Sequence, residues 1–150
     1  MNKDLLTNFL LKARTKTYAA GVGKVKELLS GSKQMEYQEG DLLYRDIYFL
    51  GNNIFPGIET IYYRDKPIWS MSYFGDFKKL TEAESDNILR GALINKWQTT
   101  RIWNVVEWSD AEYKYICNGS GDIDELKGEE TITKNDEIVY FFYYAGGYIG

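Results

Sequence analysis

Two stretches of the chain carry the same pattern, GIETIYYRDKPIWSMSYFG at residues 57–75 and GEETITKNDEIVYFFYYAG at residues 128–146. The second follows the first at a constant offset of 71 residues, without a gap. The residues that are identical at this offset are Gly57 and Gly128, Glu59 and Glu130, Thr60 and Thr131, Ile61 and Ile132, Asp65 and Asp136, Tyr73 and Tyr144, and Gly75 and Gly146. Each stretch is rich in β-branched and aromatic residues around a polar centre, which is typical of a β-hairpin. The pattern predicts a duplicated β unit.

The polar centres predict where each hairpin turns and which face carries its glutamate. Arg64-Asp65 and Asn135-Asp136 are suited to the turns. A two-residue turn at Arg64-Asp65 would place Glu59 on the face of Ile61, Ile68, Ser70 and Ser72. A three-residue turn would place it with Trp69, Met71 and Tyr73. The sequence leaves both registers open.

Further strands are predicted before each hairpin. MEYQE and LLYRDIYFL flank Gly40, as two strands joined by a turn or as one strand with a bulge, and RIWNVVEW and AEYKYICN precede the second hairpin. With two residues inserted, Asp41, Tyr44, Arg45 and Ile47 match Asp110, Tyr113, Lys114 and Ile116. The pseudo-repeats would then cover about residues 35–77 and 104–148.

Two helices are predicted by apolar residues at helical spacing. The first covers residues 3–16 and has Asn2 as its cap. The second, at residues 81–97, begins with the capping box Thr81-Glu82-Ala83-Glu84 and joins the repeats. We therefore expect one domain of the α+β class over residues 1–150. It would be an internally duplicated unit of a helix and antiparallel strands, with one curved, mainly antiparallel sheet of about 7–8 strands and helices on one face.

Composition restricts the chemistry. The chain has no histidine, one cysteine (Cys117), and 4 Trp, 13 Tyr and 7 Phe. Without histidine, Ser-His-Asp catalysis and histidine-ligated metals are excluded, and we predict no catalytic residues, metal or cofactor. The net charge of −4 argues against direct nucleic-acid binding. The single cysteine and the absence of a signal-like or membrane-spanning run favour a cytoplasmic protein without membrane contact.

The segment NGSGDIDELKGEE at residues 118–130 resembles a calcium-binding loop in its spacing of oxygen-bearing side chains. It has Ile123 where such loops need glycine, and strands are predicted on both sides. We interpret it as a solvated hairpin loop.

Several motifs together resemble a bacterial family called domain of unknown function 5680. They are YQEGDLLYRDIYFLG at residues 37–51, KPIWSMSYFG at residues 66–75, and the later KGEETI and YYAGGYI. The resemblance implies a domain that occurs alone or behind an XRE-type helix-turn-helix in transcriptional regulators. It implies no biochemical activity.

Glu59 and Glu130 are the candidate binding carboxylates because both repeats place them beside the same Thr-Ile pair. An aromatic cleft between the repeats would surround them. The residues that could line this cleft are Tyr37, Tyr44, Asp46, Tyr48, Trp69, Tyr73, Tyr113, Tyr115, Tyr140 and Tyr144. The same rings also suit a hydrophobic core, and we expect about half of them there.

Three functions follow as hypotheses. The first is a non-enzymatic effector-binding domain that holds a small amphipathic or cationic molecule, with Glu59 or Glu130 as counter-charge. The second is a protein-interaction or homo-oligomerisation module with exposed aromatic side chains. The third is a hydrolase that uses paired carboxylates.

Overall fold

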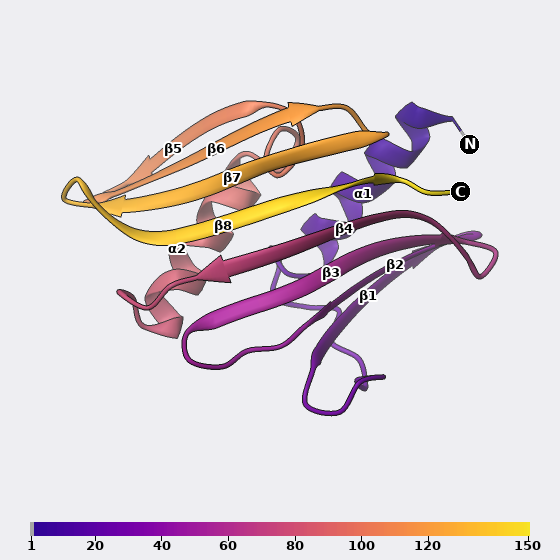
Figure 1. Ribbon diagram of the computed structural model, residues 1–150, viewed down its shortest axis with the longest axis horizontal. Helices are drawn as coiled ribbons and strands as arrows, with labels where there is room; N and C mark the ends of the chain where they lie inside the picture. The colour runs from indigo at the N-terminus through magenta and orange to yellow at the C-terminus, as the bar shows by residue number, and fades with distance from the viewer. Residues whose placement is uncertain (1) are drawn as a thin grey trace.

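The computed structural model describes residues 2–150 and contains one eight-stranded antiparallel sheet with two helices (Figure 1). The elements in chain order are α1 (Lys3–Lys16), β1 (Lys33–Glu39), β2 (Leu42–Tyr48), β3 (Ile54–Tyr63), β4 (Lys66–Asp76), α2 (Glu82–Asn95), β5 (Val105–Asp110), β6 (Tyr113–Gly121), β7 (Glu125–Lys134) and β8 (Glu137–Tyr148). This confirms the predicted α+β class and the expected number of strands.

The strands lie in the order β1-β2-β3-β4-β8-β7-β6-β5. Each set of four consecutive strands is therefore a meander, and the two meanders meet where β4 pairs antiparallel with β8. At this central contact Tyr73 lies opposite Tyr144, and Ser72 lies opposite Ala145. The sheet is open, with β1 and β5 at its edges.

Both central hairpins have a two-residue turn and a β-bulge. Arg64 and Asp65 have φ of 48° and 65°, and Asn135 and Asp136 have φ of 49° and 66°, as a type I′ turn requires. The register shifts between Ile61 and Tyr62, so that Ile61 pairs with Trp69 and Glu59 with Met71. A two-residue turn alone would have put Glu59 on the other face. The bulge adds one residue to β4 and turns Glu59 to the buried face.

The outer strands also keep the offset of 71 residues. Tyr44 lies opposite Ile61, and Tyr115 lies opposite Ile132. The structural counterpart of Tyr44 is therefore Tyr115, and the matching of Tyr44 to Tyr113 by a two-residue insertion was wrong. Side-chain identity was the weaker guide, because register is fixed by the ladder of strand pairing.

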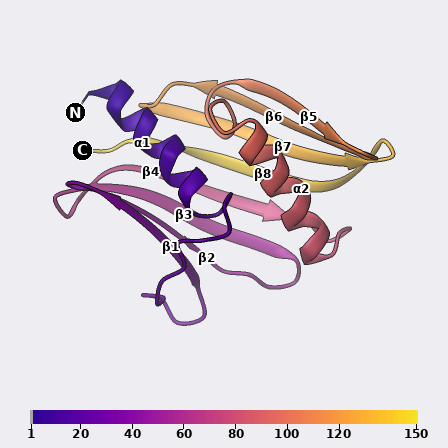
Figure 2. The ribbon, with the colours of Figure 1, turned by 180° about the vertical axis from the view of Figure 1, so that it is seen from behind.

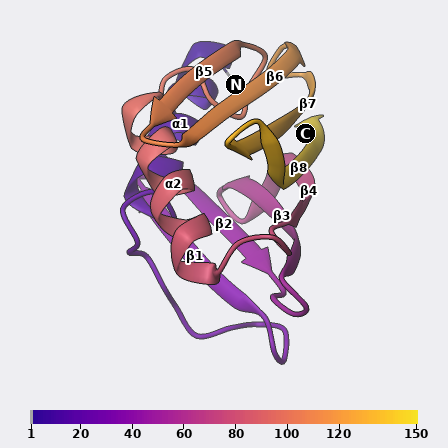
Figure 3. The ribbon, with the colours of Figure 1, turned by 90° about the vertical axis from the view of Figure 1, so that its left-hand side faces the viewer.

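Both helix starts are as predicted. The Asn2 side chain accepts hydrogen bonds from the backbone N–H groups of Asp4 and Leu5, and Thr81 and Glu84 form a reciprocal capping box. Helix α2 ends at Asn95, so Trp97 lies beyond it in a turn. Figure 2 shows α1 and α2 in front of the strands, and in Figure 3 the outer parts of the sheet bend toward the helices.

Alternate residues of the strands make the core. Tyr44, Ile61, Trp69, Met71, Tyr115, Ile132, Tyr140 and Phe142 are all buried, and they pack with Leu6, Leu10 and Leu89 of the helices. The segment at residues 118–130 is more regular than expected. Strands β6 and β7 extend through most of it and leave a turn at residues 122–124, where the Asp122 side chain accepts backbone hydrogen bonds from Asp124 and Glu125.

Candidate functional site

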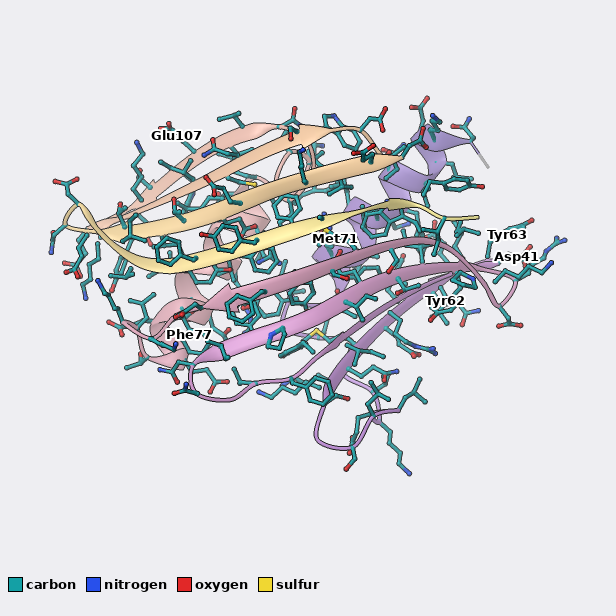
Figure 4. The ribbon with its side chains drawn as sticks, viewed as in Figure 1. Asp41, Tyr62, Tyr63, Met71, Phe77 and Glu107 are labelled. Carbon is teal, nitrogen blue, oxygen red and sulfur yellow. The ribbon has the colours of Figure 1, made fainter. Side chains whose placement is uncertain are left out.

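A cavity of about 110 Å³ lies between the two helices and the first meander of the sheet. Strands β2, β3 and β4 contribute Tyr44, Asp46, Tyr48, Phe55, Glu59 and Tyr73, while α2 contributes Glu82, Ser85, Asp86, Arg90 and Leu93. The end of α1 and the turn after it contribute Arg14, Thr15, Tyr18 and Ala19. In Figure 4, Phe77 of the lining is labelled at the end of β4, away from Asp41, Tyr62 and Tyr63 at the opposite end of the strands.

The carboxyl group of Asp46 is held by Tyr73. The Tyr73 hydroxyl donates a 2.6 Å hydrogen bond to Oδ1 of Asp46. This bond spans from β4 to β2, and the intervening strand β3 has Gly57 opposite Tyr73. A Cβ on Gly57 would lie 2.3 Å from the Tyr73 hydroxyl, so glycine is required for the ring to cross β3. In this hairpin, the glycine of the repeated Gly-Tyr pair therefore provides the space that the tyrosine ring occupies.

Asp46 is buried, with only 5% of its surface exposed, and it has no ion-pair partner among residues 2–150. Burial, and then the nearby charge of Glu59, raise its pKa to about 7. Among the described residues, one fully buried side-chain nitrogen or oxygen has no hydrogen bond, and it is Nε of Arg90. Oδ2 of Asp46 has no hydrogen bond within residues 2–150 but is not such a fully buried atom, so it keeps some accessible surface. Because Asp46 lines the cavity, we infer that Oδ2 faces it.

Glu59 is neutralised by Arg14 of α1. Nε and Nη2 of Arg14 donate to the same oxygen of Glu59, at 2.9 and 2.6 Å. The third donor, Nη1, bonds the backbone carbonyl of Arg101 at 2.9 Å. Arg14 thereby ties the first helix to β3 and to the segment after α2.

Glu130 is neutralised in a similar way by Arg101. Nε and Nη2 of Arg101 donate to its two oxygens at 2.5 and 3.2 Å, and the Tyr140 hydroxyl donates at 3.3 Å. The Arg101 guanidinium also lies 4.2 Å from the centre of the Phe142 ring. Its backbone has φ of 56°, an uncommon conformation for a residue other than glycine. The surrounding contacts hold this turn so that the side chain reaches the core.

The second meander has the same arrangement with a thiol in place of the carboxyl group. Cys117 lies opposite Glu130, as Asp46 lies opposite Glu59, and the Tyr144 hydroxyl is 3.4 Å from its Sγ. The backbone after α2 fills the space above this meander. The Tyr144 hydroxyl donates to the carbonyl of Ile102 at 2.8 Å, and Thr100 and Tyr115 share a 2.5 Å hydrogen bond. The first meander is open where the second is filled.

Three side chains connect the helices across the cavity. The Tyr18 hydroxyl donates to Asp86 at 2.8 Å, and Arg90 lies 3.3 Å from Asp86 and 5.1 Å from the centre of the Tyr18 ring. We call Tyr18, Asp86 and Arg90 the latch. It joins the turn after α1 to α2 on the side of the cavity away from the sheet.

The structure brings five of the twelve candidate binding residues together around the cavity, namely Tyr44, Asp46, Tyr48, Glu59 and Tyr73. The others lie elsewhere: Trp69, Tyr115, Glu130 and Tyr140 are core residues without exposed surface, Tyr144 is buried beneath Ile102, Tyr113 packs against Lys134, and the Tyr37 hydroxyl donates to Glu39. The prediction missed Arg14, Arg101 and the latch. Apolar spacing places Arg14 at the end of a predicted helix, but nothing in the sequence links it to Glu59.

None of the helices in residues 2–150 is long and apolar enough to cross a membrane. The described part of the chain also has no group of His, Cys, Asp or Glu side chains arranged to hold a metal ion.

The fold and the site define an α+β domain with one open antiparallel sheet, whose first meander and helices enclose a charged, aromatic cavity. The chain belongs to the family described as domain of unknown function (DUF5680), whose model matches residues 46–149. The match begins at Asp46 and covers the two central hairpins. No curated protein and no solved structure matches the chain.

Proposed function

We propose that this domain binds a small amphipathic molecule, without catalysis, in the cavity between the helices and the first meander. The observation that carries this proposal is a cavity of about 110 Å³ whose lining combines aromatic rings with a buried carboxyl group that has no ion-pair partner within residues 2–150. Ligand sites typically have apolar walls and few polar groups. A hydrophobic core would have filled such a space.

The likeness of the two meanders supports the choice of this cavity. We propose that the two meanders, each preceded by one helix, derive from one unit and that both helices cover the same face. The matching turns, the matching bulges at Ile61/Tyr62 and Ile132/Thr133, and the two Glu-Arg pairs support this origin. Only one of the two related sites is open, as expected if one unit retained binding and the other became structural.

The counter-charge in this proposal differs from the one expected from the sequence. Glu59 and Glu130 each have an arginine in hydrogen-bond contact, so neither has charge to spare for a ligand. Asp46 has none among the described residues. Asp46 therefore takes the role for which the repeated glutamates were candidates.

A thermal-shift screen with a cavity-filling variant tests the proposal. Ser85 is buried in the cavity lining, so Ser85→Phe should occupy the ligand space. A ligand at 100 times its Kd adds about 2.7 kcal/mol, and the Tm should rise by roughly 5 to 10 °C. The rise should vanish in Ser85→Phe and persist in Asn87→Phe, which changes an exposed position of the same helix. Ligand-induced rises of equal size in both variants would refute binding in this cavity.

A second candidate function rests on the face of the sheet away from the core. Ile58, Phe74, Phe141 and Tyr143 are all more than a third exposed, and the rings of Phe141 and Tyr143 stack with an interplanar angle of 9°. Exposed aromatic groups of this kind favour protein interfaces, including self-association. Sedimentation velocity should then show an oligomer that Phe74→Ser with Tyr143→Ser dissociates, while Thr131→Ser does not. A monomer at all concentrations would contradict this function.

Regulation is the setting that we propose for ligand binding. The family resemblance implies that such domains occur together with XRE-type DNA-binding domains. Because the net charge of −4 disfavours direct DNA binding by this chain, we propose that a separate DNA-binding partner in the cytoplasm responds to the ligand. No contact among the described residues favours the carboxylate hydrolase over these two functions.

A further inference from the structure

We propose that the ligand of this cavity is a small protonated amine, whose ammonium group pairs with Oδ2 of Asp46 while its apolar body lies against the aromatic lining. The inference rests on the proposed function and specifies its ligand class. Its basis is the balance of charges in the cavity wall.

Nearly every charged group of the wall has an opposite charge in contact. Arg14 pairs with Glu59 at 2.6 Å, and Arg101 with Glu130 at 2.5 Å. Two further pairs lie at the outer wall, Arg90 with Asp86 at 3.3 Å and Lys33 with Glu82 at 3.5 Å. Lys24 is exposed at the rim. Of the buried lining groups among residues 2–150, Asp46 is thus the one whose charge would be uncompensated.

An uncompensated carboxylate in this setting selects for a cation. Burial of a lone charge is costly, and an incoming ammonium group removes the cost while an anion would increase it. A neutral alcohol could bond Oδ2 but would supply no charge. Asp46 therefore discriminates between ligands of similar shape by their charge.

The groups that face Asp46 from each neighbouring element set its response to pH. They are Glu59 on β3, Tyr73 on β4, Tyr44 and Tyr48 on β2, Arg14 on α1, Tyr18 in the turn after α1, Asp86 and Arg90 on α2, and Arg101 after α2. The arginines stay charged, and burial raises the pKa of Tyr44 and Tyr73 well above the ordinary value. Asp46, with a pKa of about 7, titrates near neutrality.

Binding of a cation should therefore release a proton. In the free protein Asp46 is partly protonated at neutral pH, and an ammonium group in contact with Oδ2 favours the ionised carboxylate. Affinity should increase as the pH rises through about 7, and it should level off above that value because Asp46 is then ionised in the free protein too.

The aromatic wall is suited to the rest of such a ligand. Tyr48, Phe55, Tyr73 and Phe77 line the cavity, and Phe55 lies 6.2 Å from Tyr73 and 5.9 Å from Phe77 between ring centroids. Ring faces attract cations as well as apolar groups. An apolar cavity of about 150 Å³ holds a benzene molecule, so a volume of about 110 Å³ fits a ligand of one small ring or branched chain.

The second meander provides a matched control. Cys117 occupies the register position of Asp46 but lies beneath the backbone after α2, and it lines no part of the cavity. A conservative change there should perturb the core to a similar depth without touching the ligand. Cys117→Ser therefore separates a specific loss of binding from general loosening of the sheet.

Isothermal titration calorimetry with three probes tests the inference: cyclopentylamine, its neutral isostere cyclopentanol, and tetramethylammonium, which cannot lose a proton. At pH 8 the wild-type protein should bind cyclopentylamine at least about 10-fold more tightly than cyclopentanol. Asp46→Asn should remove this preference by weakening amine binding at least about 10-fold, with cyclopentanol little changed. Cys117→Ser should keep the wild-type preference. Between pH 8 and pH 6, tetramethylammonium affinity for the wild-type protein should fall roughly 10-fold.

The outcomes separate this inference from the proposed function. Equal binding of the amine and the alcohol, unchanged in Asp46→Asn, would overturn the amine inference and leave small-molecule binding intact. If none of the probes binds, the inference is overturned. If the thermal-shift screen also finds no ligand whose effect is lost in Ser85→Phe, the proposed function is overturned as well. Should Asp46→Asn fail to fold, tetramethylammonium binding to the wild-type protein decides: proton release and the pH-dependent fall support the inference, and pH-independent binding refutes it.

Discussion

The carboxyl group of Asp46 has one hydrogen bond, from Tyr73, and no compensating charge in contact among the described residues. Because its folded-state pKa of about 7 exceeds the unfolded value of about 4, the folded protein binds a proton more readily between these values. The free energy of unfolding should therefore decrease as the pH rises from about 4 to about 7. Asparagine can still accept the hydrogen bond from Tyr73 but carries no charge.

We predict that Asp46→Asn removes this decrease. At pH 8 the variant should be more stable than the wild type by up to about 4 kcal/mol, and near pH 4 the two should be equal. Urea unfolding at several pH values measures the difference, with Asp65→Asn in an exposed turn as the control. A difference that does not change with pH would show that the pKa of Asp46 is not raised.

The two buried Glu-Arg pairs should differ in their contribution to stability. Glu130→Gln leaves Arg101 charged in the core and should lower the free energy of unfolding by about 3 to 5 kcal/mol. Glu59→Gln should cost less, because Arg14 keeps its hydrogen bond to the backbone carbonyl of Arg101, whereas both hydrogen bonds of the Arg101 side chain among the described residues go to Glu130. Denaturant unfolding of both variants checks this order, and an equal loss would contradict it.

At the scale of elements, the capping box is a local device whose effect can be isolated. Thr81→Ala removes the side-chain oxygen that accepts from the N–H of Glu84. The free energy of unfolding should fall by about 1 kcal/mol. Asn87→Ala, at an exposed position within α2, should change stability little, and chemical denaturation of both variants measures the contrast. An equal effect of the two changes would mean that the cap is not formed.

The hairpin turns allow a stabilising change. Asp65 and Asp136 have positive φ, which glycine adopts without steric cost and which type I′ turns favour at this position. Asp65→Gly and Asp136→Gly should each raise the free energy of unfolding by about 0.5 kcal/mol, because the relief of strain at positive φ exceeds the cost of the greater backbone entropy of glycine in the unfolded chain. Asp41→Gly should be destabilising, because it removes the 2.8 Å ion pair with Arg64 and adds chain flexibility. Thermal denaturation separates these signs.

At the scale of the whole molecule, the contact between β4 and β8 makes one sheet of the two meanders. It joins them along Trp69–Asp76 and Phe141–Tyr148, and Arg14 and Arg101 connect α1, β3 and the segment after α2. Such connections should make the chain unfold as one cooperative unit.

In the variant Trp69→Phe, all remaining tryptophans follow α2, so its fluorescence reports on the second half of the chain. We predict that this fluorescence changes at the same denaturant concentration as the far-ultraviolet circular dichroism, which reports on the whole chain. Two separate transitions would instead show that the meanders are independent, contrary to the prediction of a single domain.

Local patterns in the sequence determined the elements of this protein. The two helices with their caps, the turns at Arg64-Asp65 and Asn135-Asp136, and the α+β class all follow from periodicity and turn chemistry, which act over a few residues. The sequence also indicated Glu59, Asp46 and three tyrosines that the structure places around one cavity. These residues share the inner face of the sheet because strand side chains alternate.

The tertiary structure decided which face Glu59 takes and which buried acid has no ion-pair partner among the described residues. The turn residues do not predict the β-bulge that shifts the register of the first hairpin, because strand pairing responds to packing over the whole hairpin. Arg14 and Arg101 reached Glu59 and Glu130 from distant parts of the chain. Ion pairing depends on distances in space, so only the folded chain could show that Asp46, rather than either repeated glutamate, has its charge available.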